Sequence, residues 1–253
     1  MAKTKRKPKI QISRHAQPFL YKGGKIGVLF IHGYTDSLWQ IRHLARELHQ
    51  KGVTCMGICL PGHGTTPEDL LNFTTSDWLS STKRALVDLR KFCQKVYVVG
   101  VSLGGNLALS LAAKDPNLVD GLICVGTPMF IKNQELFKFL IPIVSKFKKF
   151  WPKRIPESKK ELCRRVGIYD KFPLKSVLEV IEFVDKNRVE VAKVKIPVLI
   201  IHVGEKLYVD PKSYQYLYDN LNSKKKEILK VKDHRGNSTQ RTIFKKSCEF
   251  LEI

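Results

Sequence analysis

Short apolar runs alternate with longer stretches of helical periodicity along most of this chain. The apolar runs have the length of buried strands, and we predict strands at residues 18–21, 26–32, 53–59, 95–99, 119–125, 198–202 and 227–231. Between them we predict helices at residues 38–51, 76–93, 106–113, 211–221 and 239–251. Alternation of this kind predicts an α/β fold, in which a mostly parallel sheet is covered by helices on both faces.

The alternation stops between residues 130 and 191. This segment contains four prolines and three shorter helical patterns, which we place at residues 135–149, 158–165 and 174–188. An interruption of this kind is the natural place for a cap over a site at the edge of the sheet. We therefore predict a basic, flexible arm at residues 1–14, a core formed by residues 15–129 and 192–253, and a helical cap inserted at residues 130–191.

The segment Gly100-Val101-Ser102-Leu103-Gly104 joins a predicted strand to a predicted helix. The chain must turn sharply at Ser102, and the flanking glycines let backbones pass closely without a Cβ clash. Such a turn exposes the serine oxygen above the sheet, at the positive end of the following helix. Small residues also mark ordinary turns, but the strand–turn–helix context favours a catalytic nucleophile at Ser102.

The strand at residues 26–32 runs directly into Gly33-Tyr34-Thr35. In acyl transfer the developing oxyanion needs two preorganised N–H donors. We predict that Leu103 supplies one of them and Tyr34 the other. Taken alone, Gly33 would be a turn at the end of a strand and His32 a hydrogen-bonded core histidine, but next to the predicted nucleophile we favour the oxyanion hole.

From Pro18 to about Leu251 the chain resembles the small bacterial carboxylesterases and monoacylglycerol lipases of the α/β-hydrolase fold. The resemblance is carried by residues 29–35 (LFIHGYT), 61–64 (PGHG), 100–105 (GVSLGG), 127–132 (TPMFIK) and 197–201 (PVLII). These blocks stand in the family's order. The resemblance implies an eight-stranded, mostly parallel sheet with a small helical cap, and hydrolysis of acyl esters without a cofactor or metal.

The family places its catalytic acid after the strand at residues 198–202 and its histidine after the strand at residues 227–231. When the chain is paired with the family pattern without gaps, Lys206 falls at the acid position and Gly236 at the histidine position. Neither residue fits its role. Glu205 adjoins the first position, and His234 precedes the second by two residues.

We therefore predict Ser102, His234 and Glu205 as the catalytic set. Asp210 is a weaker candidate for the acid, because Asp-Pro at the start of a helix is typical of an N-cap. A second hypothesis remains open, in which the chain has lost turnover and acts as a ligand-binding or interaction module. The predicted nucleophile and oxyanion loop favour the enzyme, whereas the two unmatched positions favour the module.

The first predicted cap helix has an apolar side and a lysine side between residues 135 and 151. Such a stripe packs against the body of the protein or lies at a membrane surface. In either case its apolar side is placed to line an acyl pocket. For that pocket we predict Phe130, Leu136 and Leu140.

Forty-five Lys and Arg residues against 23 Asp and Glu residues give the chain a net charge of +22. This excess suits acidic partners or anionic membranes, but no nucleic-acid-binding module is recognisable. Six scattered cysteines and the lack of a signal-peptide pattern indicate a cytoplasmic protein with reduced thiols. We expect a monomer that acts on a small acyl ester, with weak attachment to anionic membrane surfaces and no specific nucleic acid.

Overall fold

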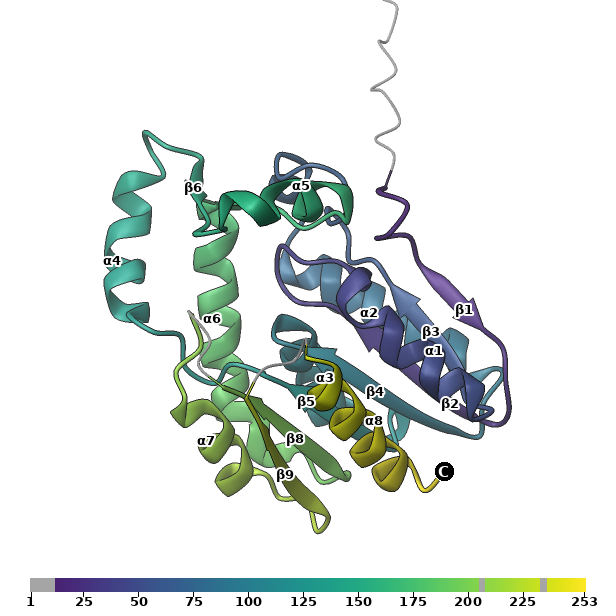
Figure 1. The fold of residues 1–253 in the computed structure, drawn as a ribbon. Helices are drawn as coiled ribbons and strands as arrows, with labels where there is room; N and C mark the ends of the chain where they lie inside the picture. The colour runs from purple at the N-terminus through teal and green to yellow at the C-terminus, as the bar shows by residue number, and fades with distance from the viewer. Residues whose placement is uncertain (1–11, 205–207, 233–235) are drawn as a thin grey trace, which may run out of the picture.

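The computed structural model describes residues 12–204, 208–232 and 236–253 (Figure 1). Its main feature is a seven-stranded sheet with the strand order β1-β3-β2-β4-β5-β8-β9. Only β1 runs antiparallel to its neighbour among these seven strands of the described chain. The strands are β1 (Phe19–Tyr21), β2 (Ile26–Ile31), β3 (Thr54–Ile58), β4 (Lys95–Val101), β5 (Gly121–Val125), β8 (Val198–Val203) and β9 (Lys226–Val231). The predicted α/β fold is confirmed.

Among the described residues this sheet has seven strands, one fewer than the eight that the family resemblance implies. Residues 14–16, which precede β1, form a turn. This stretch lacks an apolar–polar alternation, and the backbone N–H of Ser13 donates to the carbonyl oxygen of Gly64 at 2.8 Å. The Ser13 hydroxyl also donates to the carbonyl oxygen of Arg165, so this end of the predicted arm is bound to the body. Residues 1–11 of the arm lie outside the described residues.

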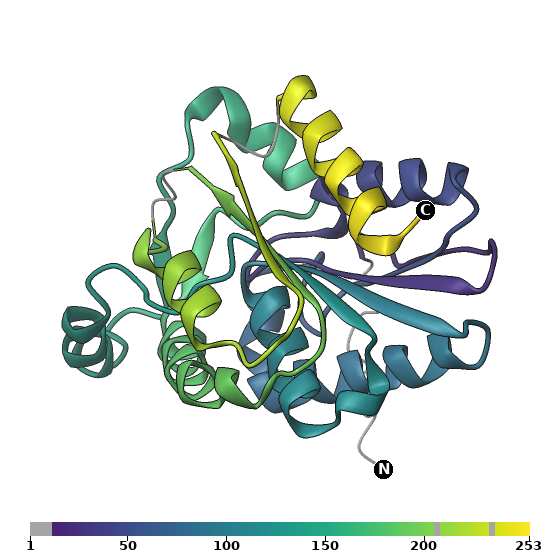
Figure 2. The same ribbon diagram turned by 90° about the horizontal axis from the view of Figure 1, so that it is seen from below.

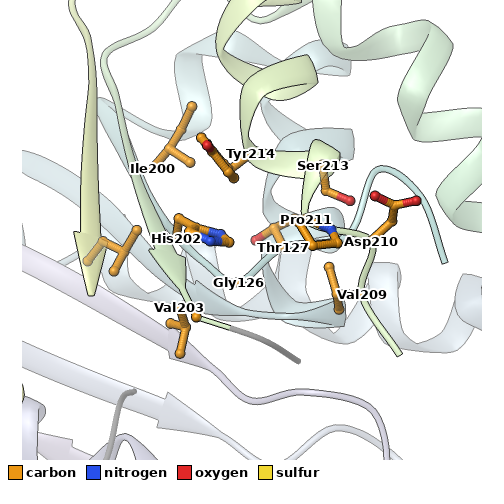
Figure 3. A pocket seen from close by; sticks show the side chains of 12 residues that line it. Gly126, Thr127, Ile200, His202, Val203, Val209, Asp210, Pro211, Ser213 and Tyr214 are labelled. Atoms are coloured by element: carbon orange, nitrogen blue, oxygen red, sulfur yellow. The ribbon is translucent and has the colours of Figure 1, made fainter. Parts of the chain in front are cut away.

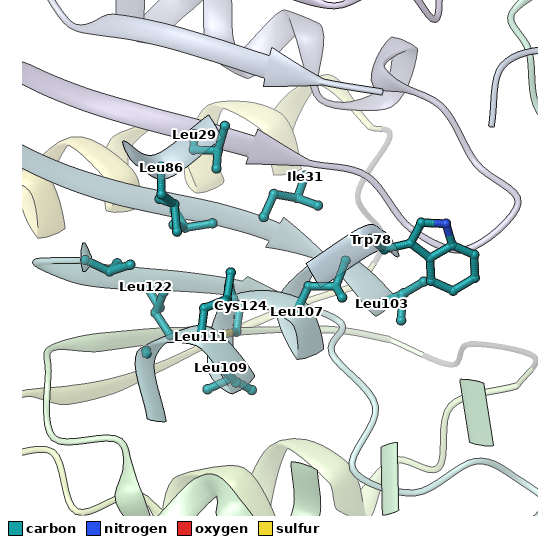
Figure 4. Packing of buried hydrophobic residues seen from close by; sticks show 14 of the residues in the cluster. Leu29, Ile31, Trp78, Leu86, Leu103, Leu107, Leu109, Leu111, Leu122 and Cys124 are labelled. Atoms are coloured by element: carbon teal, nitrogen blue, oxygen red, sulfur yellow. The ribbon is translucent and has the colours of Figure 1, made fainter. Parts of the chain in front are cut away.

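Side chains alternate between the two faces of the sheet, as the period of a strand requires. In β2, Leu29 and Ile31 join the core on one face, whereas Val28 and Phe30 join the core on the other. Figure 2 shows helices above and below the sheet, and Figure 4 shows the packing of the first core around Trp78 and Leu107. The predicted two-faced covering of the sheet is therefore correct.

Each face has its own helices. The core that contains Val28 is covered by α1 (Arg42–Gln50) and α8 (Asn237–Leu251). The core that contains Leu29 is covered by α2 (Thr75–Arg90), α3 (Leu103–Lys114), α6 (Leu174–Glu190) and α7 (Lys212–Asn220). Short 3-10 helices lie at Leu38–Gln40, Asp69–Asn72, Pro116–Leu118 and Val191–Lys193.

The segment that we predict as the cap, residues 130–191, contains α4 (Gln134–Val144), α5 (Glu157–Arg165) and α6. Our prediction of a helix at residues 135–149 is too long, because residues 145–147 form a turn. The cap also contains an antiparallel ribbon of β6 (Phe150–Pro152) and β7 (Lys171–Pro173), which the sequence analysis missed. Within the described residues, no helix has the length and hydropathy needed to cross a membrane.

Candidate active site

Ser102 occupies a strained turn between β4 and α3. Its backbone has φ 52° and ψ −117°, a combination that residues with a side chain rarely adopt. The turn is held by the N–H of Ser102, which donates to the carbonyl oxygen of Val125 at 2.9 Å, and by the N–H of Gly105, which donates to the carbonyl oxygen of Ser102 at 3.0 Å. The serine is neither fully buried nor fully exposed. This is the backbone geometry of a nucleophile elbow.

Two glycines let the elbow form. A Cβ at Gly100 would lie 2.6 Å from backbone atoms of Gly104, and a Cβ at Gly104 would overlap the carbonyl oxygen of Ile31. The start of α3 therefore sits directly on the ends of β4 and β2. The Gly-x-Ser-x-Gly spacing in the sequence has its physical cause in these two approaches.

The loop after β2 lies beside the elbow. A Cβ at Gly33 would be 3.3 Å from the Cβ of Ser102, so the two backbones are in close contact. Across the described part of the chain, the backbone N–H groups of Tyr34 and Leu103 donate to no protein acceptor. The first N–H groups of a helix have no acceptor within the helix, so the N–H of Leu103, the first residue of α3, is available to a ligand, as is that of Tyr34. These are the two donors that the sequence predicts for an oxyanion hole.

Two buried histidines hold this loop in place. Nε2 of His32 accepts from the N–H of Leu60 at 3.0 Å, and its Nδ1 lies 2.9 Å from the carbonyl oxygen of Gly33. Nε2 of His63 accepts from the N–H of Thr35 at 3.1 Å. Because Nε2 is an acceptor in both rings, both imidazoles are neutral with the proton on Nδ1. Burial lowers the pKa of His32 to about 4 and lowers that of His63 well below its usual value.

The cap holds the same loop from above. The Tyr34 hydroxyl lies 2.8 Å from the Ser176 hydroxyl, and the Tyr34 ring stacks on Phe172 with centroids 6.0 Å apart. Burial raises the pKa of Tyr34 well above its usual value. The carbonyl oxygen of Thr35 accepts from the N–H of Tyr169 at 3.1 Å and from Nζ of Lys153 at 3.3 Å. The sequence analysis missed these supports, since they join residues more than 100 positions apart.

The loops that follow β8 and β9 begin next to each other. Val203 pairs with Val231, and the N–H of Gly204 donates to the carbonyl oxygen of Val231 at 2.8 Å. Both strands run parallel to β4, so the two loops leave the edge of the sheet at which Ser102 lies. Glu205, Lys206 and His234 lie outside the described residues, and their roles remain predictions.

Asp210 is engaged at the start of α7. Its Oδ1 accepts from the N–H of Lys212 at 3.0 Å, and its carbonyl oxygen accepts from the N–H of Ser213 at 3.0 Å. Nζ of Lys212 is 3.5 Å from Oδ2 of the same carboxylate. These contacts are those of a helix-capping aspartate, as the Asp-Pro pair predicts.

The three predicted pocket residues lie in two different places. The Phe130 ring meets the edge of the Tyr216 ring at 5.0 Å between centroids, and the cations of Arg188 and Lys212 lie 4.8 and 4.3 Å from its centroid. Leu136 and Leu140 lie on α4, and both are exposed. Their contribution to an acyl pocket stays a prediction.

A hollow of about 330 Å³, including its open mouth, lies at the carboxyl ends of β5 and β8 (Figure 3). Thr127, His202 and Tyr214 line it, and the His202 and Tyr214 rings are 4.2 Å apart. Neither Ser102 nor Tyr34 is among the described residues that line this hollow.

In the described ranges, no three His, Cys, Asp or Glu side chains lie close enough together to form a metal site. All six cysteines, each of them described, are free thiols.

Comparisons with known proteins agree with this geometry. The chain is 30% identical to a thermostable monoacylglycerol lipase of Bacillus sp. (strain H-257), over 93% of this chain and 94% of the relative. It is 26% identical to a carboxylesterase of Bacillus subtilis (strain 168), over 84% and 85% of the two chains. A solved structure reported under the metagenome-derived lipolytic enzymes LipS and LipT superposes with a TM-score of 0.85 at 26% identity, over 96% of this chain and 99% of that chain.

The family model described as serine aminopeptidase, S33, matches residues 25–234, a span that contains the elbow, the loop after β2 and the whole cap. The solved structures that match are α/β-hydrolases, in agreement with the sheet and the elbow described above. On this evidence, the chain belongs to the serine aminopeptidase S33 family of α/β-hydrolases.

Proposed function

We propose that the protein is a serine hydrolase of carboxylic acid esters, of the carboxylesterase or monoacylglycerol lipase type. The observation that carries this proposal is the strained backbone of Ser102 beside two N–H groups, of Tyr34 and Leu103, that have no protein acceptor in the described chain. A strained residue costs about 1–3 kcal/mol. A strained serine beside two available donors is the arrangement that acyl transfer requires, and it favours the enzyme over the ligand-binding module.

The reaction runs through an acyl-enzyme. Oγ of Ser102 attacks the ester carbonyl while His234 accepts the hydroxyl proton, and the Tyr34 and Leu103 N–H groups stabilise the oxyanion. The C–O bond to the alcohol breaks, and His234 returns the proton to the leaving alkoxide. Water then attacks the acyl group by the same route, releasing the carboxylic acid and restoring Ser102. Glu205 orients the imidazole in this scheme, and no cofactor is required.

The relatives support the substrate class. One relative that matches over most of its length is a monoacylglycerol lipase and another is a carboxylesterase, and neither name specifies an acyl chain. We therefore propose short acyl esters and monoacylglycerols as the first substrates to assay. An aminoacyl anilide belongs in the same panel, because the family model is described as an aminopeptidase. Faster turnover of the anilide than of every ester would contradict the ester assignment.

A fluorophosphonate probe tests the nucleophile directly. We expect a covalent adduct on Ser102, located by mass spectrometry of the labelled protein. Ser102→Ala should abolish labelling, whereas Ser80→Ala, which changes an exposed serine of α2, should leave it intact. If the wild type forms no adduct under conditions that label a control esterase, the hydrolase is rejected. Labelling without turnover of any ester would favour the ligand-binding module.

A further inference from the structure

Thr35 directly follows Tyr34, the predicted oxyanion donor, and its backbone has a conformation that threonine rarely adopts. Its φ is 55°, in the left-handed region. Among the described residues it is the one β-branched residue with a positive φ, and it is fully buried. Strain of this kind persists only where the surrounding structure holds it, and it is concentrated at functional sites. The contacts of Thr35 therefore bear on the direction of the Tyr34 N–H.

Three segments that are far apart in the sequence hold the two sides of Thr35. Its N–H donates to Nε2 of His63 at 3.1 Å. Its carbonyl oxygen accepts from the N–H of Tyr169 at 3.1 Å and from Nζ of Lys153 at 3.3 Å. His63 is neutral and Tyr169 contributes a backbone group, so Lys153 is the one of these three partners that brings a positive charge. Hydrogen bonds from a charged donor are roughly twice as strong as those between neutral groups.

The Lys153 ammonium lies between the loop after β2 and the ribbon of β6 and β7. Lys153 follows β6 directly, and its N–H donates to the carbonyl oxygen of Asp170 at 2.7 Å, so the ribbon fixes its backbone. Its Nζ lies 4.9 Å from the centroid of the Phe172 ring, which stacks on the Tyr34 ring. It forms no ion pair with a carboxylate of the described residues. A partly buried ammonium is costly without such a partner, which points to a functional role rather than to stability.

We propose that Lys153 is a positioning residue of the oxyanion hole, which holds Thr35 through its ammonium group and so keeps the Tyr34 N–H directed at the ester carbonyl. In this role Lys153 acts through Thr35 rather than on the substrate. Its charge also favours the negative charge that develops on the carbonyl oxygen during attack. This inference rests on the proposed function, because an oxyanion hole matters only if Ser102 attacks an ester.

The charge of Lys153 depends on pH within the range of an enzyme assay, because burial lowers its pKa to about 8. The titratable groups around it are Asp36 of the loop after β2, His63 of the loop after β3, Cys163 of α5, and Tyr169 and Asp170 before β7. Burial raises the pKa of Tyr169 to about 12 and lowers that of His63 well below its usual value. Carboxylates do not titrate near pH 8. Lys153 therefore carries its charge below about pH 8 and loses it as the pH rises.

Lys153→Met removes the charge and keeps the length of the side chain. With p-nitrophenyl butyrate at about pH 7, we expect kcat to fall about tenfold and KM to change less than about twofold, because the loop acts on the transition state. Lys171→Met is the matched control, since Lys171 lies on β7 of the same ribbon, over the Phe150 ring, and pairs with Glu68 at 2.7 Å. It should leave kcat unchanged. Equal kcat values for Lys153→Met and the wild type, or an equal loss in Lys171→Met, would overturn the proposal.

Lys153→Arg separates the charge from the packing of the side chain. Arginine stays protonated in proteins, so this variant should keep most of the wild-type kcat at about pH 7. The wild-type kcat should fall as the pH rises from about 7 to about 9.5, whereas that of Lys153→Arg should not. Cys163→Ser removes the thiol near Lys153, and it should show the same fall as the wild type. A wild-type profile without the fall, or an equal fall in Lys153→Arg, would also overturn the proposal.

Two further measurements separate this role from a structural one and from the proposed function. Urea denaturation should give Lys153→Met the stability of the wild type, because the lost hydrogen bond is offset by the removal of a costly charge. A lower stability of Lys153→Met, with no recovery of kcat in Lys153→Arg, would make Lys153 a merely structural residue. If the wild type hydrolyses no ester and forms no fluorophosphonate adduct, the hydrolase is rejected, and this role with it. If the wild type is active and Lys153→Met is equally active, the hydrolase stands and only the role of Lys153 is rejected.

Discussion

His32 accepts a hydrogen bond from the backbone N–H of Leu60, 28 residues further along the chain, at a distance of 3.0 Å. The same ring has its Nδ1 2.9 Å from the carbonyl oxygen of Gly33. One neutral imidazole therefore joins the loop after β2 to the loop after β3. Protonation of Nε2 would remove the acceptor that Leu60 needs, so the charged form of His32 is incompatible with this arrangement.

This contact predicts a loss of stability in mild acid. The pKa of His32 is about 4 in the folded protein because of burial, below the ordinary value of 6.5. Between pH 6.5 and 4 the unfolded chain therefore binds a proton at His32 that the folded chain does not bind. The free energy of unfolding falls as pH drops through this range. The contribution of this one group is on the order of 3 kcal/mol over that range. Urea denaturation at a series of pH values from 7.5 to 4.5 measures it.

The variant His32→Asn isolates the effect. It keeps an amide near the position of Nδ1 but does not titrate, so its stability should depend less steeply on pH than that of the wild type. His63, whose pKa is also lowered by burial, retains its own contribution in this variant. His15→Asn, which removes an exposed imidazole, is the matched control. If His32→Asn and the wild type show the same pH slope, burial does not lower the pKa of His32 as assigned.

The strained backbone of Ser102 predicts that glycine is more stable at this position than serine. With φ 52° and ψ −117°, a residue with a Cβ is strained, whereas glycine adopts these angles freely. Ser102→Gly should raise the free energy of unfolding by about 1 kcal/mol, after the larger entropy of the unfolded glycine chain is subtracted. Ser102→Ala keeps the strain and should leave stability nearly unchanged. Equilibrium denaturation of the two variants checks this, and equal stabilities would contradict strain at the elbow.

Local patterns in the sequence were enough to place most of the sheet and Ser102. The strands β2, β4, β5, β8 and β9 have apolar runs bounded by turn residues, so their predicted limits differ from the observed ones by one or two residues. The elbow was found because a strand, two glycines and a helix follow one another within 20 residues. Features encoded by neighbours in the chain are visible without a structure.

Features that depend on residues far apart in the chain could not be predicted from the sequence. The ribbon of β6 and β7 pairs Phe150 with Pro173, and neither three-residue strand has enough alternation to be recognised. The supports of the loop after β2 come from Tyr169 and Ser176, more than 100 residues away. The expected eighth strand came from the family resemblance, whereas the apolar runs of the sequence predicted seven strands.

Two variants distinguish the candidate acids. Oδ1 of Asp210 caps α7 through the N–H of Lys212, so Asp210→Ala should mainly lower stability, by about 1 kcal/mol. Glu205→Gln should instead lower turnover, because it removes the charge that orients the predicted base. Ester hydrolysis and thermal denaturation are measured on both variants. The opposite pattern would make Asp210 the acid, and unchanged turnover in both would leave a serine–histidine pair without one.

His234 is the residue on which the proposed mechanism depends most. A serine hydroxyl is a weak nucleophile until a neighbouring base takes its proton. The loop after β9 begins beside the loop after β8, at the edge of the sheet that carries Ser102. His234 is the one histidine in the sequence beyond Gly204. His234→Ala should therefore reduce ester turnover by several orders of magnitude and leave the fold intact, with residual activity from the oxyanion hole.

The other histidines provide the controls for this prediction. The Nε2 atoms of His32 and His63 already accept backbone hydrogen bonds, so neither ring is available as the base without breaking the oxyanion loop. His43→Ala, which removes a histidine that pairs with Glu47 on α1, should leave turnover unchanged. The wild-type rate should fall in acid as the catalytic imidazole takes up a proton, because only the neutral imidazole can accept the proton of Ser102. If His234→Ala hydrolyses esters as fast as the wild type, another residue is the base, and the role assigned to the loop after β9 is wrong.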